Sequence, residues 1–103
     1  MISCKPGVKA NGMKPEILFA IMVADQIYSE CGAECVITEI TGGKHGHQSL
    51  HYVGYAVDLR TRHLTGEQAA SIVSDLKSAL TDEYDVILES NHIHIEFQPK
   101  WTD

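Results

Sequence analysis

The sequence predicts an α+β domain in which helices pack on one face of a small, largely antiparallel sheet. Two segments have apolar residues at helical spacing, and four short runs have the composition or the alternation of strands. The last two of these runs are separated by only two residues, as in a hairpin. With 103 residues and 44% hydrophobic content, the chain fits one core, so we expect a single domain over residues 1–103. The pattern leaves the strand order open.

The first helix is expected between Lys14 and Cys31. Pro15 suits its first turn and Gly32 its end. Seven residues at helical spacing are predicted to face the core: Ile17, Ala20, Ile21, Ala24, Ile27, Tyr28 and Cys31. The β-branched run CVITEI then predicts a strand over residues 35–40, and the Gly-rich polar segment TGGKHGHQSL predicts a loop after it.

The second half of the chain begins with a strand predicted from Tyr55 to Thr61. Thr65 followed by Gln68 has the pattern of a capping box, which opens a helix that should end near Leu80. The predicted core face of this helix is made of Ala69, Ile72, Val73, Leu76 and Ala79. The runs YDVILE and HIHIEF follow as two further strands.

Composition and charge exclude several classes of function. A formal net charge of −6 without a Lys/Arg cluster argues against a nucleic-acid partner. The chain has neither an apolar signal region at its start nor a long apolar run, so we expect cytoplasmic synthesis without a signal peptide and no membrane insertion. Cys4, Cys31 and Cys35 cannot all pair within one chain, and we expect free, structural thiols rather than metal ligands.

The predicted hairpin brings ionisable side chains together. Alternation along HIHIEF gives the strand two faces. The polar face is made of His92, His94 and Glu96, and the core face of Ile93, Ile95 and Phe97. If Ser90 and Asn91 form a two-residue turn, Glu89 lies directly across from His92, and both share a face with His94. Such a cluster is either a functional site or a solvated polar face.

The segment SLHYVGYAVDLRTR, residues 49–62, places Asp58 in what otherwise reads as a buried strand. A buried carboxylate is costly unless something neutralises it, and a metal ion is one such partner. His51 and Asp58 differ in strand parity, but Gly54 could let both turn toward one point. With a histidine of the hairpin they would supply three ligands and leave a fourth position open, as in catalytic zinc sites.

These motifs resemble the zinc D-alanyl-D-alanine carboxypeptidase and endopeptidase family, which includes phage cell-wall peptidases and vancomycin-resistance dipeptidases. The family shares its fold with the hedgehog signalling domain. The resemblance rests on SLHYVGYAVDL followed by HIH, and it extends from the helix at Pro15 through Phe97. It implies that His51, Asp58 and His94 bind zinc and that His92 lies in the active site.

Two differences from the family pattern bear on mechanism and specificity. Many cell-wall members carry the catalytic carboxylate three residues before the last zinc ligand, where this chain has Asn91; the hedgehog-like arrangement points to Glu89 after a one-residue shift. Carboxypeptidase members often hold the substrate's terminal carboxylate with an Arg before the first zinc ligand. This chain has only Lys44, His45 and His47 there, which favours an endopeptidase.

Several other polar residues have two interpretations each. Glu39 could orient a ligand histidine through its ring N–H, or it could be an exposed residue at a strand end. Arg60 and Arg62 could bind an anionic peptide stem, or they could simply lie on the wet face of the sheet. His45 and His47 could contact the substrate or support the metal ligands, or they could simply be solvated in the loop. Trp101 could cover the sheet edge or stack on a sugar.

The resemblance implies zinc-dependent hydrolysis of amide bonds in peptidoglycan stem peptides or cross-links, as in a phage or prophage endolysin. Glu89 would accept a proton, and His92 would stabilise charge or move a proton. The alternatives are a non-catalytic, zinc-containing binding module like hedgehog, and a D-Ala-D-Ala carboxypeptidase or dipeptidase. A monomer that meets the cell wall after its release is expected.

Overall fold

The computed structural model describes residues 2–41 and 54–98 and confirms the predicted α+β fold class. Within these ranges the chain forms two helices and five strands. In chain order they are β1 (Ile2–Cys4), α1 (Pro15–Glu30), β2 (Cys35–Glu39), β3 (Ala56–Arg60), α2 (Gly66–Ala79), β4 (Tyr84–Leu88) and β5 (His92–Phe97). Six of these elements match the predicted ones to within one residue at every boundary.

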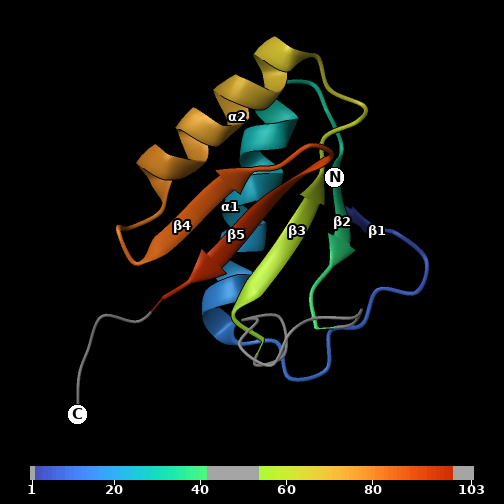
Figure 1. Ribbon diagram of the computed structural model, residues 1–103, viewed down its shortest axis with the longest axis vertical. Helices are drawn as coiled ribbons and strands as arrows, with labels where there is room; N and C mark the ends of the chain where they lie inside the picture. Colours follow the sequence, from blue (N-terminus) through green and yellow to red (C-terminus); the bar gives the residue numbers. More distant parts are fainter. Residues whose placement is uncertain (1, 42–53, 99–103) are drawn as a thin grey trace.

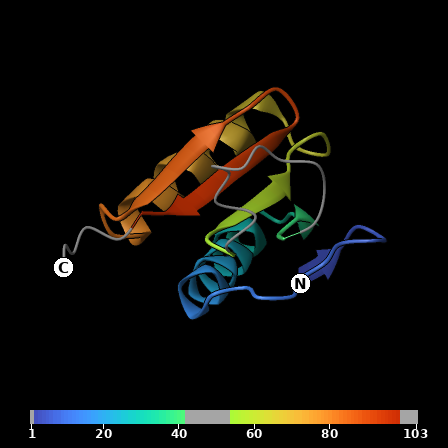
Figure 2. The same ribbon diagram turned by 60° about the horizontal axis from the view of Figure 1, so that its bottom comes forward.

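The strands form one sheet in the order β1-β2-β3-β5-β4 (Figures 1 and 2). β1 runs parallel to β2, and the other three pairs are antiparallel, so the sheet is largely antiparallel as predicted. β1 is not among the predicted elements, because a strand of three residues is too short to show a periodicity. Its position depends on pairing with β2, which begins with Ile2 opposite Cys35.

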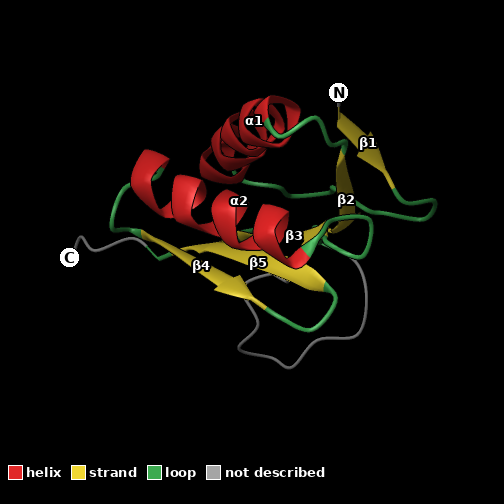
Figure 3. Cartoon of the chain, turned by 90° about the horizontal axis from the view of Figure 1, so that it is seen from above, coloured by secondary structure: helices red, strands yellow, loops and turns green. Residues whose placement is uncertain are grey.

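Both helices cover the same face of the sheet, as Figure 3 shows from above. Two tyrosine hydroxyls connect the helix layer to the strands. Tyr28 of α1 donates to the carbonyl of Arg60 at 2.9 Å, and Tyr84 of β4 donates to the carbonyl of Glu16 at 2.9 Å. Burial raises the pKa of Tyr28 above its usual range, which keeps this hydroxyl a donor. The end of β3 is therefore fixed from the helix side.

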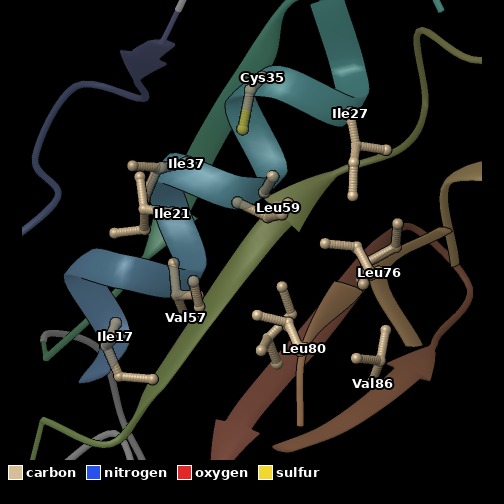
Figure 4. Packing of buried hydrophobic residues seen from close by; sticks show 14 of the residues in the cluster. Ile17, Ile21, Ile27, Cys35, Ile37, Val57, Leu59, Leu76, Leu80 and Val86 are labelled. Carbon is tan, nitrogen blue, oxygen red and sulfur yellow. The ribbon is translucent and has the colours of Figure 1, made fainter. Parts of the chain in front are cut away.

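The core lies between the helices and the sheet (Figure 4). Six of the seven residues predicted for the α1 face are buried, and the seventh, Cys31, is half-buried at the helix end. On α2 the buried residues are Ala69, Ile72 and Leu76. The prediction for Ala79 is wrong: it is exposed at the last turn, and Leu80 is buried in its place. Each fully buried Ile or Leu contributes roughly 1.5–3 kcal/mol to the free energy of unfolding.

Two local predictions are confirmed, the capping box of α2 and the two-residue connection between β4 and β5. The capping box of α2 is complete, because the backbone N–H of Gln68 donates to Thr65 Oγ1 and that of Thr65 donates to Gln68 Oε1. The N–H of Glu89 donates to the carbonyl of His92 at 2.8 Å, so Ser90 and Asn91 form a two-residue connection. Glu89 therefore lies directly across from His92.

Gly54 adopts a backbone conformation that other residues rarely take, with φ of 80°. A Cβ at this position would collide with the carbonyl oxygen of Gly12, so no larger residue fits. The carbonyl of Gly54 accepts a hydrogen bond from Lys14 N at 3.1 Å, which joins the start of α1 to the chain entering β3. The predicted irregularity at Gly54 is present, but the direction of His51 lies outside the described residues.

Candidate metal centre

Asp58 is a buried carboxylate in the middle of the sheet. Its neighbours on β3, Val57 and Leu59, point into the core, so strand alternation turns Asp58 to the opposite face, away from the helices. Only 8% of the residue is exposed. An ionised carboxylate in such a place requires a compensating charge or metal.

His94 lies beside Asp58, as its direct partner in the pairing of β3 with β5. The Nδ1 atom of His94 is 2.8 Å from Asp58 Oδ1, and its Nε2 atom is 2.8 Å from Glu96 Oε1. The side-chain amide of Gln98 donates to the other oxygen of Glu96 and fixes that carboxylate. These side chains form a chain in the order carboxylate, imidazole, carboxylate, amide.

Both ring nitrogens of His94 face carboxylate oxygens, which only accept hydrogen bonds. Without a metal, the ring therefore carries both protons and a positive charge. The hydrogen bond to Asp58 is the main cause that raises the pKa of His94, and the bond to Glu96 adds to it, while burial acts in the opposite direction. His94 is thus an imidazolium held between the carboxylates of Asp58 and Glu96.

His92 lies one pleat further along β5, on the same face. Its Nε2 atom is 3.8 Å from Asp58 Oδ2, and its Nδ1 atom is 2.7 Å from the side-chain oxygen of Asn91. Because an amide oxygen only accepts, Nδ1 is the donor in this bond. Nε2 faces the second oxygen of Asp58, so His92 and His94 approach the same carboxylate.

Glu89 stands apart from this cluster. Its backbone pairs with His92, which puts both residues on one face, but its side chain is exposed at the end of the hairpin. Within residues 2–41 and 54–98, it makes no side-chain hydrogen bond or ion pair. The structure therefore brings His92 and His94 to Asp58 and leaves Glu89 beside them at the edge.

A β-bulge in β2 places two consecutive residues next to Asp58. The register shifts between Ile37 and Glu39, so that Glu39 becomes the direct partner of Asp58 while Thr38 Oγ1 donates to the Asp58 carbonyl at 3.3 Å. In a regular strand these two side chains would point to opposite faces. The bulge lets both line the site, where Glu39 was one of the candidates from the sequence.

A cavity of about 360 Å³ opens beside Asp58 on this face. Its lining residues come from β2, β3 and β5 and from the segments next to β1, β3 and β5: Lys5, Thr38, Glu39, Asp58, Arg60, Arg62, Asn91 and His92. Lys5 was not singled out in the sequence analysis. No local signal marks it, because its place depends on the unpredicted strand β1.

Zinc fits the part of the predicted ligand set that is described. His94 Nδ1 and Asp58 Oδ1 face each other, and Glu96 holds the other ring nitrogen, as a carboxylate commonly does behind a metal-ligating histidine. The third predicted ligand, His51, lies outside the described residues, as do His45, His47 and Trp101. The part of the chain that is described contains no complete group of three metal-ligating side chains.

The three cysteines are free thiols, as predicted. Cys35 is buried in the core at the start of β2, and Cys4 is exposed. Burial, together with the charge of Asp25, raises the pKa of the Cys35 thiol to about 12. Cys35 is therefore an inert core residue under ordinary conditions.

Neither a scan against protein-family models nor a search of curated proteins found a match for this chain. None of the helices within the described ranges is long and apolar enough to cross a membrane.

Proposed function

We propose that this protein is a zinc-dependent hydrolase of amide bonds in peptidoglycan stem peptides or cross-links, of the kind that phage and prophage endolysins carry out. The observation that most supports this proposal is the contact of His94 Nδ1 with the buried Asp58, backed by Glu96. The resemblance of SLHYVGYAVDL and HIH to zinc peptidases of the cell wall supplies the substrate class.

In this proposal Asp58, His94 and His51 hold the metal. Zinc would replace the proton on His94 Nδ1, and the bond from Nε2 to Glu96 would persist and keep the ring oriented. When bound, zinc supplies a Lewis acid and makes a water nucleophilic near neutral pH. Three protein ligands leave room for that chemistry, whereas a structural site is usually closed by four.

In this proposal the neighbouring residues of the hairpin accept and transfer protons. Asn91 orients the ring of His92, whose Nε2 faces Asp58 and can stabilise charge or relay a proton. Glu89 is the proposed proton acceptor, placed across from His92 on the same face. Its exposed side chain has to turn toward His92 when substrate is bound, since catalytic contacts often tighten only in the complex.

The exposed position of Glu89 also favours the second candidate function, a zinc-containing binding module without catalysis. Such a module would use the same metal ligands and the same cavity but no proton acceptor. The two functions differ in turnover and agree in metal content, so an assay of hydrolysis separates them.

Incubation of purified peptidoglycan with the zinc-loaded protein tests the proposal. We expect the zinc-loaded protein to release new amino groups. Chelation should stop this release, and adding zinc back should restore it. The variant Asp58→Asn should release none, while Asp75→Asn, a matched change on α2, should behave as the parent does. Equal release by chelated and zinc-loaded protein would disprove zinc-dependent hydrolysis.

A further inference from the structure

Three cations line the cavity beside Asp58: Lys5, Arg60 and Arg62. The whole chain contains only eight Lys and Arg residues and has a formal net charge of −6. Concentrating three of the eight at one cavity makes its wall locally positive in an otherwise acidic protein.

Contacts between strands fix the backbone positions of the three cations. Lys5 follows β1, and its N–H donates to the Ile37 carbonyl at 2.8 Å. Arg60 ends β3 as the direct partner of His92, and its carbonyl accepts the buried Tyr28 hydroxyl. Arg62 comes just after, where the neighbouring Thr61 pairs with the end of the hairpin. The fold itself therefore brings the positive charges together.

The charged groups of these three side chains do not stabilise the described part of the fold through polar contacts. Among the residues that the structure describes, the charged groups of Lys5, Arg60 and Arg62 make no ion pair or hydrogen bond. Glu39 and Asp58 line the same cavity, so three cations face two carboxylates there. Asp58 is already engaged with His94.

We propose that this cavity is a carboxylate subsite, in which Arg60, with Arg62 and Lys5, binds a carboxylate of the substrate peptide close to the cleaved amide. The proposal rests on the proposed function and names a feature of its substrate. The planar fork of an Arg matches a carboxylate in two parallel hydrogen bonds, and two arginines with one lysine give the subsite a clear preference for anions.

Geometry limits how far this carboxylate lies from the reacting amide. Arg60 and Asp58 are two residues apart on one face of β3, which separates their Cα atoms by about 7 Å. An extended peptide covers that length with about two residues. The carboxylate should therefore belong to a residue next to the cleaved bond or one beyond it.

The size of the cavity agrees with a small group. Its volume of about 360 Å³ lies at the lower end of the range for small-ligand pockets, enough for one end of a peptide. Stem peptides offer two carboxylates of this kind, the free C-terminus and the α-carboxylate of a γ-linked glutamate.

Synthetic stem peptides that differ only in amidation test the subsite. One carries both carboxylates, one has the glutamate α-carboxylate as an amide, one has the C-terminus as an amide, and one has both amidated. With zinc-loaded parent, we expect amidation of one of the two carboxylates to lower kcat/KM by at least about tenfold, mainly through KM. Which single amide has this effect identifies the source.

Variants assign this effect to the cations. Arg60→Gln should lower kcat/KM about tenfold on the free acid. On the doubly amidated peptide, kcat/KM should be the same for Arg60→Gln and the parent, because the substitution and the amidation remove the same contact. Arg60→Lys keeps the charge without the fork and should fall between. Arg62→Gln, at an exposed position, provides a second variant should Arg60→Gln fold poorly. The control is Lys77→Gln on α2, the helix layer behind the sheet.

Equilibrium binding separates failure of the subsite from failure of the proposed hydrolysis. Calorimetry measures affinity of the same peptides for zinc-loaded parent and for Arg60→Gln. If nothing is hydrolysed, but the parent binds the free acid at least about tenfold more tightly than the amide and Arg60→Gln does not, the subsite stands without the enzyme. If all four peptides are bound and cleaved equally by both proteins, the subsite is wrong and the hydrolase stands. The carboxylate subsite would also be wrong if inorganic phosphate displaced the peptide while amidation left the affinity of the peptide unchanged.

Discussion

His94 Nδ1 lies 2.8 Å from Asp58 Oδ1, and the two residues are direct partners on the neighbouring strands β3 and β5. Their side chains meet on the face of the sheet that is turned away from both helices. Because Asp58 is buried and His94 is also held by Glu96, this contact holds a nitrogen and an oxygen of the two proposed zinc ligands at one point.

The first prediction concerns metal content. The parent should bind one zinc per chain, and His51→Ala, Asp58→Ala and His94→Ala should each lose it, because each removes a ligand. Loss of a ligand typically weakens zinc binding by far more than the ~10–100-fold that a change behind a ligand produces. Elemental analysis after dialysis measures the zinc. Full zinc in all three variants would contradict the site, and Asp75→Asn serves as the control that keeps it.

The second prediction is that zinc affinity increases with pH. Zinc has to displace the proton from His94 Nδ1, and the bond to Asp58 raises the pKa of His94 above 6.5. Affinity should therefore fall about tenfold per pH unit below that raised pKa and level off above it. Titration calorimetry over a pH series measures this. Glu96→Gln should move the transition to lower pH, whereas Glu67→Gln on α2 should not.

The same raised pKa predicts the pH dependence of stability without zinc. Protonated His94 is favoured in the folded state, so its contribution is fully present below pH 6.5 and is lost as pH rises through the raised pKa. The melting temperature of the chelated parent should exceed that of chelated His94→Gln at acidic pH, and the difference should shrink toward alkaline pH. A constant difference across the series would show that His94 does not titrate between these carboxylates.

The third prediction addresses Glu89 and His92. Glu89→Gln keeps the shape of the hairpin but removes the proton acceptor, and His92→Ala removes the group that faces Asp58. Turnover of peptidoglycan should fall by ~10²–10⁴ in each variant while zinc content stays at the parent level. Rate assays and elemental analysis on the same samples check both statements. Parent-like turnover of Glu89→Gln would assign the proton acceptor to His92 instead.

The fourth prediction separates the cysteines by their surroundings. Burial raises the pKa of Cys35 from 9.0 to about 12, which lowers its thiolate fraction about a thousandfold near neutral pH, while Cys4 is exposed. Thiol labelling of the native protein should modify Cys4 readily and leave Cys35 unmodified until the chain is unfolded. Mass spectrometry of peptides from the labelled protein measures this. Equal labelling of both thiols in the native state would contradict the buried position of β2.

Much of the fold could be predicted because it depends on local patterns. The helical spacing from Ile17 to Tyr28, the capping box at Thr65 and the alternation along HIHIEF each appear within a few residues. The same alternation placed His92 and His94 on one face, and Asp58 stood out because a carboxylate interrupts a buried strand.

The remaining features depend on contacts between distant segments. β1 exists through its pairing with β2, and Lys5 reaches the cavity only as a result of that pairing. The bulge between Ile37 and Glu39 turns Thr38 and Glu39 to one face, and no periodicity in CVITEI announces it. The exposed side chain of Glu89 likewise reflects its position at the end of a two-residue connection, which alternation alone does not specify.

The most direct test of zinc-dependent peptidoglycan hydrolysis is to identify the chemical ends that the zinc-loaded protein releases from purified peptidoglycan. Mass spectrometry of the soluble fragments should show new amino and carboxyl ends at one type of amide bond, absent with chelated protein and with His94→Ala. If fully zinc-loaded parent produces no new ends from any wall type while it still binds the fragments, the protein is a zinc-containing binding module and the proposed hydrolysis is wrong.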